Sequence, residues 1–284
     1  MEKWILSAFA DEYCPDLRGQ VEAMGRYGIS HIELRFLDGK NVSELTAQEA
    51  GKAKRILEDG GIRVSALGSP LGKFHLEERF ASHLEVARRI FENANILETN
   101  QIRMFSFYPR PGESRAQCRQ EVLDKLGILL DMADSCGLTL CHENEGGLYG
   151  ESPQQCLDLM ETFGGRLKTV FDMGNYTLGG YAPWPEGYEM LKDYIAYFHI
   201  KDALTAGAIV PAGLGEAKIK EILHAHSAYT GKPVMLSLEP HLQTFDGLNK
   251  LVDAVRFENP YQFPTQQDAF AEAVKCTKAL LKNE

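Results

Sequence analysis

Strand-like and helix-like segments alternate eight times along this chain, and that repeat constrains its fold more than any other feature. Each strand candidate is a short apolar run, and successive candidates start about 26 to 40 residues apart. The candidates are Trp4–Ala10, His31–Phe36, Arg63–Gly68, Gln101–Tyr108, Leu138–Glu143, Lys168–Asp172, Tyr194–His199 and Val234–Glu239. Eight alternations without a break in composition predict an α/β protein in which a single (β/α)8 TIM barrel takes up residues 1–284.

Helix signals lie between the strand candidates. Thr46 followed by Glu49 forms a capping-box pattern, and Ser152, Pro153 and Gln155 occupy the N-cap, N1 and N3 positions of another helix. The main alternative is an open, doubly wound sheet. Such sheets usually carry a glycine-rich phosphate loop after the first strand, but the sequence there reads FADEY and contains no glycine. The closed barrel is therefore the preferred prediction.

The composition narrows the range of partners. Hydrophobic residues make up 44% of the chain, enough for one large core, and the formal net charge is −10. That charge argues against nucleic acid, which requires a basic surface, and is easier to reconcile with a small polar metabolite. The six cysteines form no CxxC pair and are typical of reduced thiols in a cytoplasmic protein. The apolar run near the N-terminus, about six residues long, is too short for a signal peptide or a membrane span.

Chemistry-bearing side chains end four consecutive strand candidates. Glu143, Asp172, His199 and Glu239 are the last residues of the fifth to eighth runs. In a parallel barrel the carboxyl ends of all strands meet around one mouth, so residues far apart in sequence can share one ion. Each acid taken alone could equally cap a helix or form a salt bridge. The coincidence of four strand ends instead predicts a divalent-metal site at the C-terminal mouth of the barrel.

The donor set indicates which ions suit the site. Three carboxylates and one imidazole favour a hard or borderline ion, with Mn²⁺ the first choice, Mg²⁺ and Co²⁺ as alternatives and Zn²⁺ possible. Strand periodicity places Cys141 on the same face as Glu143 but one layer deeper, where we expect core packing. His142 faces the other way and is expected to pack against a helix.

Seven phrases spread over the chain form an ordered set. They are SAFADE (7–12), IELRFLDGKNV (32–42), HENEGGLYGESP (142–153), FDMGN (171–175), FHIKDA (198–203), PAGLGE (211–216) and SLEPHL (237–242). Together they resemble the xylose isomerase-like TIM-barrel superfamily, in particular its sugar phosphate isomerase/epimerase family. In that family a Glu, an Asp, a His and a Glu after strands five to eight hold one metal ion. The resemblance thus implies the same four ligands as the strand ends.

The resemblance also implies an activity. A ketose or keto-sugar would chelate the ion, and Glu143 and Glu239 would serve as the acid/base pair of a sugar isomerase or epimerase that works through a metal-stabilised enediolate. A dehydratase or lyase acting on an inosose or keto-glycoside is the main alternative, because the same intermediate can lose a leaving group. A non-catalytic sugar-binding barrel and an endonuclease IV-like DNA-repair enzyme are further alternatives, and the latter would need more histidines and a basic groove.

The sequence departs from the family pattern at two positions. Many relatives carry a histidine two residues after the strand-five Glu, where this chain has Glu145, and another three residues after the strand-six Asp, where it has Asn175. Both positions lie on the substrate side of the metal. They therefore leave the ligand assignment intact but affect the expected sugar specificity.

Further residues are candidates for contact with a small-molecule sugar. Glu33 and Arg35 alternate onto one face of the second strand, so at least one could touch substrate or both could form a structural ion pair. The remaining candidates follow other strands or lie in long loops: Lys73, His75, Glu145, Asn175, Trp184 and Lys201. Lys201 could alternatively pair with Asp202 at the surface. The irregular segment Phe257–Phe263 is a candidate contact between subunits of a dimer or tetramer.

Overall fold

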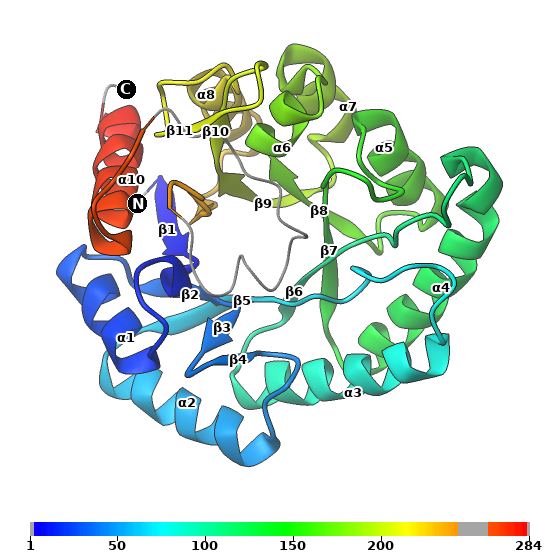
Figure 1. The fold of residues 1–284 in the computed structure, drawn as a ribbon, viewed down its shortest axis with the longest axis horizontal. Coiled ribbons are helices and arrows are strands. Elements are labelled where there is room, and N and C mark those ends of the chain that lie inside the picture. The colour runs from blue at the N-terminus through cyan, green and yellow to red at the C-terminus, as the bar shows by residue number, and fades with distance from the viewer. Residues whose placement is uncertain (1–2, 244–260, 283–284) are drawn as a thin grey trace.

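The computed structural model describes residues 3–243 and 261–282, and eight parallel strands form its centre. They enclose the middle of the molecule as a ring (Figure 1). The strands are β1 (Trp4–Ala8), β2 (His31–Leu34), β5 (Arg63–Gly68), β6 (Gln101–Met104), β7 (Thr139–Glu143), β8 (Lys168–Asp172), β9 (Ile195–Ile200) and β12 (Val234–Leu238). The hydrogen-bonded order is β1-β12-β9-β8-β7-β6-β5-β2. The strands β1 and β2 stand at the two ends of this order and lie side by side, so the barrel is nearly closed, as the eightfold repeat predicts.

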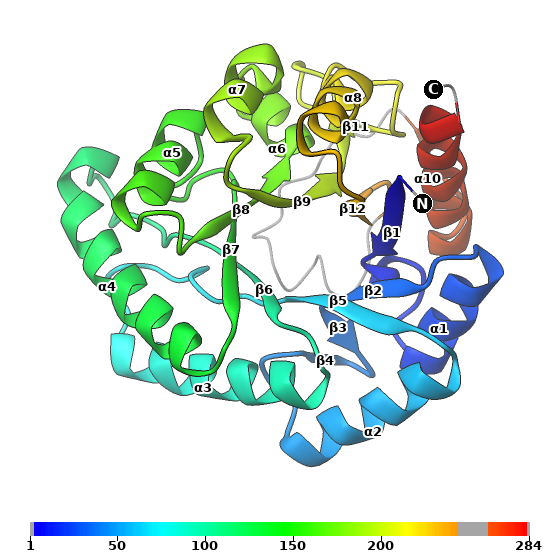
Figure 2. The same cartoon turned by 180° about the vertical axis from the view of Figure 1, so that it is seen from behind.

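Helices form an outer ring around the strands, which Figures 1 and 2 show from opposite sides. Their bounds are α1 (Leu17–Arg26), α2 (Ala47–Asp59), α3 (Phe80–Ile96), α4 (Arg115–Ser135), α5 (Pro153–Thr162), α6 (Met173–Leu178), α7 (Tyr188–Leu191), α8 (Ile219–Thr230) and α10 (Gln266–Lys282). Helix α10 lies between α1 and α8 in this ring. The Phe270 ring of α10 contacts Tyr13 and Tyr27, which flank α1.

Several short elements lie in the connections between the barrel strands. Two are short helices, the 3₁₀ helix η1 (Ala10–Glu12) and the π-helix η2 (Pro183–Gly187). The others form two small antiparallel ribbons, β3 (Phe36–Leu37) with β4 (Lys40–Asn41) and β10 (Asp202–Ala203) with β11 (Ile209–Val210). Among the residues that the structure describes, no helix is long and apolar enough to cross a membrane.

The predicted helix starts are confirmed. Thr46 Oγ1 accepts from the Glu49 backbone N–H while the Glu49 carboxylate reaches back to Thr46, which completes a capping box at α2. Helix α5 begins with the same reciprocal bonds between Ser152 and Gln155, and Pro153 stands in its first turn. These caps fix the points where the chain turns from the barrel mouth into the outer ring.

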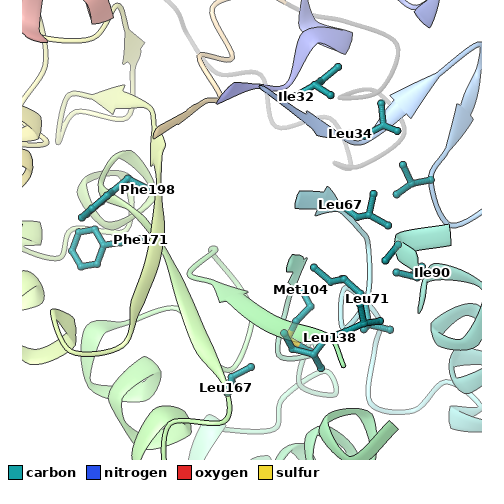
Figure 3. Close-up of a cluster of buried hydrophobic side chains, with 14 of the residues drawn as sticks. Ile32, Leu34, Leu67, Leu71, Ile90, Met104, Leu138, Leu167, Phe171 and Phe198 are labelled. Atoms are coloured by element: carbon teal, nitrogen blue, oxygen red, sulfur yellow. The ribbon is translucent and has the colours of Figure 1, made fainter. Parts of the chain in front are cut away.

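The core divides into two layers because each strand alternates its side chains. One face of every strand packs against the helices, and Figure 3 shows part of this layer, including Phe171 of β8 beside Phe198 of β9. The other face fills the inside of the barrel, where Ala66, Cys141, Val170 and Tyr197 pack together. Cys141 therefore lies in the core layer beneath Glu143, as expected. His142 lies on the outer face, beside Ser106 and Cys156 of α5.

Three strand predictions extend two or more residues too far. β1 ends at Ala8 rather than Ala10, since the next residues form the 3₁₀ helix η1, and β2 ends at Leu34 rather than Phe36, since Phe36 enters the β3–β4 ribbon. β6 ends at Met104 rather than Tyr108. Beyond Met104 the chain leaves the sheet, with Phe107 at a positive φ of 66°, and its N–H groups bond to carbonyls of the loop after β5 instead of to a barrel strand. Most of the proposed subunit contact Phe257–Phe263 lies outside the described residues.

Candidate metal centre

The four predicted ligands converge at the C-terminal mouth of the barrel. One donor atom from each of Glu143, Asp172, His199 and Glu239 lies within 4.8 Å of the others, and all four side chains are buried. They come from or directly follow β7, β8, β9 and β12, which are consecutive neighbours in the barrel (Figure 1). Register aligns them, because Asp172 pairs with His199 across β8 and β9. The cluster therefore follows directly from strand ends meeting at one edge.

The His199 ring stands at the centre of the cluster. Its Nδ1 lies 2.9 Å from Glu143 Oε1 and 3.1 Å from Glu239 Oε2, while its Nε2 lies 3.1 Å from Glu33 Oε2. Phe9 meets the imidazole edge-on at a centroid distance of 5.2 Å. The two ring nitrogens thus have different roles in the geometry: Nδ1 faces the other ligands, and Nε2 faces the barrel interior.

Asp172 is held by the backbone around it. It is the N-cap of α6, and its Oδ1 accepts the Asn175 backbone N–H at 2.8 Å. The Asn144 side chain bonds to both the N–H and the C=O of Asp172, at 3.0 and 2.9 Å. A carboxylate fixed in this way loses little conformational entropy when it binds an ion.

Three buried cations neutralise part of the acidic charge. Lys201 Nζ donates to Asp172 Oδ2 and to Glu239 Oε2, each at 2.8 Å. Arg35 Nη1 donates to Glu239 Oε1 at 2.9 Å, and Arg103 Nε lies 3.3 Å from Glu143 Oε2. Lys201 is therefore part of the cluster and does not form the surface pair with Asp202 considered as an alternative.

Asp202 instead anchors the loop between β11 and α8. Its two carboxylate oxygens accept backbone N–H groups from Ala203, Gly213, Gly215 and Ala217, at 2.7 to 3.2 Å. A Cβ at Gly215 would lie 2.1 Å from Asp202 Oδ1, so the close approach requires glycine. The PAGLGE phrase is thus tied to the residue next to Lys201.

A second charged group adjoins Glu239. Arg35 also donates to both oxygens of Asp11, at 2.9 and 3.2 Å, and its guanidinium lies 4.0 Å from the Phe9 ring centroid. Glu12 Oε2 accepts the His241 backbone N–H at 2.8 Å. Burial raises the pKa of Glu12 to about 8, against the attraction of Arg35. The 3₁₀ helix η1 therefore carries two acids into the barrel mouth.

Burial and charge act in opposite directions on the ligands. Burial lowers the pKa of His199, but Glu143, Glu33 and Glu239 outweigh it and raise that pKa well above its ordinary value. Burial raises the pKa of Asp172. For Glu239, burial also raises the pKa, but Lys201 and His199 dominate and hold it well below the usual range. Glu239 is consequently a charged, proton-free carboxylate at neutral pH.

The structure brings several predicted substrate residues to this mouth. Asn175 accepts from Lys201 Nζ at 3.2 Å, and Arg35 and Lys201 contact Glu239 directly. Lys73 forms an ion pair with Glu145 at 2.6 Å and lies over the Phe105 ring, which Arg103 also contacts.

Two other predicted residues lie in different surroundings. His75 is exposed and its ring packs on Tyr108, with centroids 5.0 Å apart. Trp184 packs on Tyr188, 5.5 Å between centroids, and Tyr188 in turn meets His226 of α8. Within residues 3–243 and 261–282, neither ring forms a hydrogen bond, ion pair or ring contact with the four candidate ligands.

Some residues of the centre escaped sequence reasoning. Asp11 and Glu12 follow the first strand in the same way that the ligands follow later ones, so the strand-end rule applied to every strand would have found them. Arg103 is a charged residue between the outward-facing Ile102 and Met104, and its alternation marks it as inward-facing. His241 gave no such signal, because it lies two residues beyond the ligand Glu239.

The donor set fits a divalent cation. Three carboxylates and one imidazole nitrogen converge from rigid strand ends, and their mutual repulsion is only partly offset by the neighbouring cations. Oxygen-rich donors with a single imidazole suit Mn²⁺, Mg²⁺, Co²⁺ or Zn²⁺, and the identity of the ion is not fixed by the ligands alone.

Solved structures share the fold at low sequence identity. The D-allulose 3-epimerase from Methylomonas sp. in complex with D-allulose matches with a TM-score of 0.76 and 13% identity, covering 100% of this chain and 98% of that one. The IolI protein with a bound zinc atom gives 0.73 and 16%, covering 98% of each chain. The probable 3-DHS dehydratase AsbF from Bacillus anthracis gives 0.71 and 18%, covering 98% and 99%.

Sequence comparison assigns the family. No curated protein sequence matches the chain. The family model described as "Xylose isomerase-like TIM barrel" matches residues 21–257, which include all four ligands of the centre. The barrel topology, the acidic cluster at its mouth and this match agree, and the chain therefore belongs to the xylose isomerase-like TIM barrel family.

Proposed function

We propose that this protein is a metal-dependent sugar isomerase or epimerase that acts on a ketose or keto-sugar. The observation that carries the proposal is the pair of buried glutamates, Glu143 and Glu239, which approach the same ring nitrogen of His199 from β7 and from the end of β12. Two carboxylates in one candidate metal site can act as a pair, in which one accepts a proton from the substrate and the other, when protonated, donates one. The family assignment and the fold shared with a D-allulose 3-epimerase support the same reading.

The chemistry divides between the ion and the protein. A bound divalent cation would polarise the sugar carbonyl and stabilise the negative charge that develops on its oxygen. One glutamate removes the proton from the carbon next to the carbonyl, and the other returns a proton, which inverts that carbon if it acts from the opposite face. Proton transfer by a positioned carboxylate contributes about 10²–10⁴-fold to the rate.

The surroundings keep Glu239 in the ionised form that a proton acceptor requires, while the neighbouring cations weaken its basicity. Arg35 and Lys201 each donate to one of its oxygens, at 2.9 and 2.8 Å, and the pKa of Glu239 lies well below its usual range because of Lys201 and His199. Glu143 lies beside Arg103 and Asn175. We propose that Asn175, Lys201, Glu145, Arg35, Lys73, His75 and Trp184 contribute to substrate binding, and that Mn²⁺ is the native ion.

An eliminating enzyme is the second candidate. Glu145 and Asn175 stand where many relatives have histidines, and Glu145 forms an ion pair with Lys73 at 2.6 Å. We propose that this pair lies on the substrate side of the centre and protonates a leaving hydroxyl. The fold shared with a probable 3-DHS dehydratase is consistent with that outcome.

Incubation in D₂O separates the candidates. The Mn²⁺-loaded protein is mixed with a panel of ketoses, including D-fructose, D-allulose and D-tagatose, and with an inosose and 3-DHS. We expect a new sugar that carries one deuterium next to its carbonyl and no other change in mass. Loss of water from a substrate would identify a dehydratase instead. The absence of both exchange and elimination from the whole panel, with metal at saturation, would contradict an enzyme of either kind.

A chelator arm tests the role of the ion. Prolonged treatment with EDTA should abolish deuterium exchange, and readdition of Mn²⁺, Mg²⁺, Co²⁺ or Zn²⁺ should restore it. The ion that restores the highest rate identifies the metal best suited to the site. Exchange that persists in protein shown by elemental analysis to be metal-free would contradict metal dependence.

A further inference from the structure

We propose that Glu33 is the positioning residue of the metal centre, and that it holds His199 so that Nδ1, and not Nε2, faces the ion. The inference rests on the metal binding in the proposed function but not on what happens to the sugar. Glu33 lies on β2, across the barrel from the four ligands, and its side chain is fully buried. The sequence placed it on one strand face with Arg35, as a candidate for substrate contact or for an ion pair.

The contacts of Glu33 form a short chain beneath the centre. Its Oε2 lies 3.1 Å from His199 Nε2, and its Oε1 accepts the Tyr197 hydroxyl at 2.7 Å. Tyr197 and His199 are two residues apart on β9, so both rings point into the barrel. Both oxygens of the carboxylate therefore have a defined partner, and the Tyr197 ring belongs to the apolar layer that seals the barrel below.

The direction of these bonds determines the tautomer. An ionised carboxylate only accepts hydrogen bonds, so the imidazole nitrogen that faces Glu33 must carry the proton. A neutral imidazole has one N–H, and its other nitrogen then offers a lone pair. That nitrogen is Nδ1 once an ion is bound. Without an ion, Nδ1 also faces the carboxylates of Glu143 and Glu239 and carries a proton as well, in keeping with the raised pKa of His199. A bound ion would replace that proton, while Glu33 retains the proton on Nε2. Metal-binding histidines generally donate their other N–H to a carboxylate or carbonyl, which fixes the ring and raises its basicity.

The backbone is shaped to deliver this carboxylate. The pairing of β2 with β5 shifts register between Ile32 and Glu33, so that Glu33 lies opposite Ala66. Irregularities of this kind re-aim a side chain and are frequent next to active sites. A carboxylate buried among apolar side chains is costly unless it is paired. The small Ala66 neighbour leaves room for the longer acid, and the pairing with His199 and Tyr197 offsets the burial.

The test measures metal affinity, and needs no substrate. Glu33→Gln keeps the shape of the side chain but removes its charge, and its amide can donate to Nε2 as well as accept from it, so the proton on Nε2 is no longer fixed. We expect Mn²⁺ and Zn²⁺ to bind about 10–100-fold more weakly in competition with a chromogenic chelator. Tyr197→Phe, which removes one donor and leaves the carboxylate, should weaken binding less. Cys141→Ala is the matched control, since Cys141 lies in the same inner layer, and it should bind metal within about twofold of wild type.

A spectroscopic arm reads the tautomer directly. The ¹⁵N shifts of the His199 ring in zinc-loaded protein should show a protonated Nε2 and a metal-bound Nδ1 in the wild type. A metal-bound Nε2 would overturn the inference whatever the variants do, including the case in which Glu33→Gln fails to fold. Wild-type affinity in Glu33→Gln with an unchanged tautomer would overturn it as well, and would leave the proposed function standing. A wild-type protein that binds none of the ions would reject both.

Discussion

Single side chains define the chemistry of this centre, and Glu239 is the one with the most neighbours. It bonds to Arg35 and Lys201 and lies beside His199 and His241. Each cation favours the ionised form, and an ionised carboxylate is what proton abstraction needs. Such a residue can bind the ion and move the proton at the same time, so its two roles have to be separated experimentally.

Glu239→Gln should lower turnover by at least about 10²-fold, because an amide keeps the shape of the side chain but does not accept a proton near neutral pH. Metal affinity should also fall, so turnover is measured by ketose interconversion with Mn²⁺ in excess. Glu143→Gln should behave in the same way, and one of the two variants should still exchange substrate protons with D₂O without inverting the carbon. Full activity in either metal-saturated variant would place the base elsewhere, with Glu145 and Lys201 the next candidates.

At the residue scale, the sequence was most informative where the position of a residue in a strand determines the direction of its side chain. The four ligands could be found because strand ends meet at one mouth, and Glu33 could be placed because strand faces alternate. The contact of Glu33 with His199 could not be predicted, because it depends on which side chains of β9 reach β2 through the barrel interior. His241 lies after a turn, where no period fixes the direction of a side chain, and only three-dimensional packing places it 3.5 Å from Glu239.

At the scale of elements, single buried acids hold whole loops in place. Asp202 accepts four backbone N–H groups, three of them from the loop that leads into α8. Buried N–H groups left without an acceptor cost about 1–3 kcal/mol each. The loop is adjacent to Lys201, so the order of this segment also bears on the metal centre.

Asp202→Asn should lower the free energy of unfolding by about 1–3 kcal/mol, because the amide NH₂ cannot accept the N–H groups that one carboxylate oxygen accepts. Urea unfolding measures the loss, and limited proteolysis should show new cleavage within residues 203–217. Glu221→Gln is the control, since Glu221 is an exposed acid in the first turn of α8 and its loss should change stability by no more than about 0.5 kcal/mol. Equal stability of the two variants would show that Asp202 does not anchor the loop.

Element boundaries were less predictable than elements. The eight alternations predicted every barrel strand, but the run Gln101–Tyr108 leaves the sheet after Met104, and Phe107 then adopts a positive φ of 66°. Its outer part bonds to the loop after β5, and an apolar segment looks the same in sequence whichever partner it has. Capping boxes gave sharper limits, because a cap is a local interaction between residues three apart.

At the scale of the whole molecule, three buried histidines link stability to pH. Burial lowers the pKa of His83 to about 4, of His142 to about 3 and of His226 to about 4, from an ordinary value of 6.5. Below pH 6.5 the unfolded chain therefore binds protons that the folded chain does not. These three histidines therefore contribute a loss of stability as the pH decreases from about 6.5 towards 4, whereas Glu12, whose pKa burial raises to about 8, acts in the opposite direction.

His83→Gln should flatten this dependence by about 1.5 kcal/mol between pH 6.5 and 5, the contribution of one such histidine. Glutamine can still accept the Gly72 backbone N–H that His83 Nε2 accepts at 3.0 Å, so the loop contact is retained. Urea unfolding at both pH values, with chelator present, gives the difference between wild type and variant. Identical pH slopes would mean that His83 is protonated in the folded protein as well.

The candidate metal ligands and the charged residues around them come from two different groups of barrel strands. The ligands come from the consecutive strands β7, β8, β9 and β12, whereas the acids and cations that surround them come largely from β1, β2 and β6 and the turns that follow. For laboratory evolution this is a practical boundary. Libraries confined to the loops at residues 69–79 and 105–114 can sample new substrates while the four ligand-bearing strands keep the ion in place. If the proposed function holds, the protein is in that sense a starting scaffold for reprogrammed ketose chemistry.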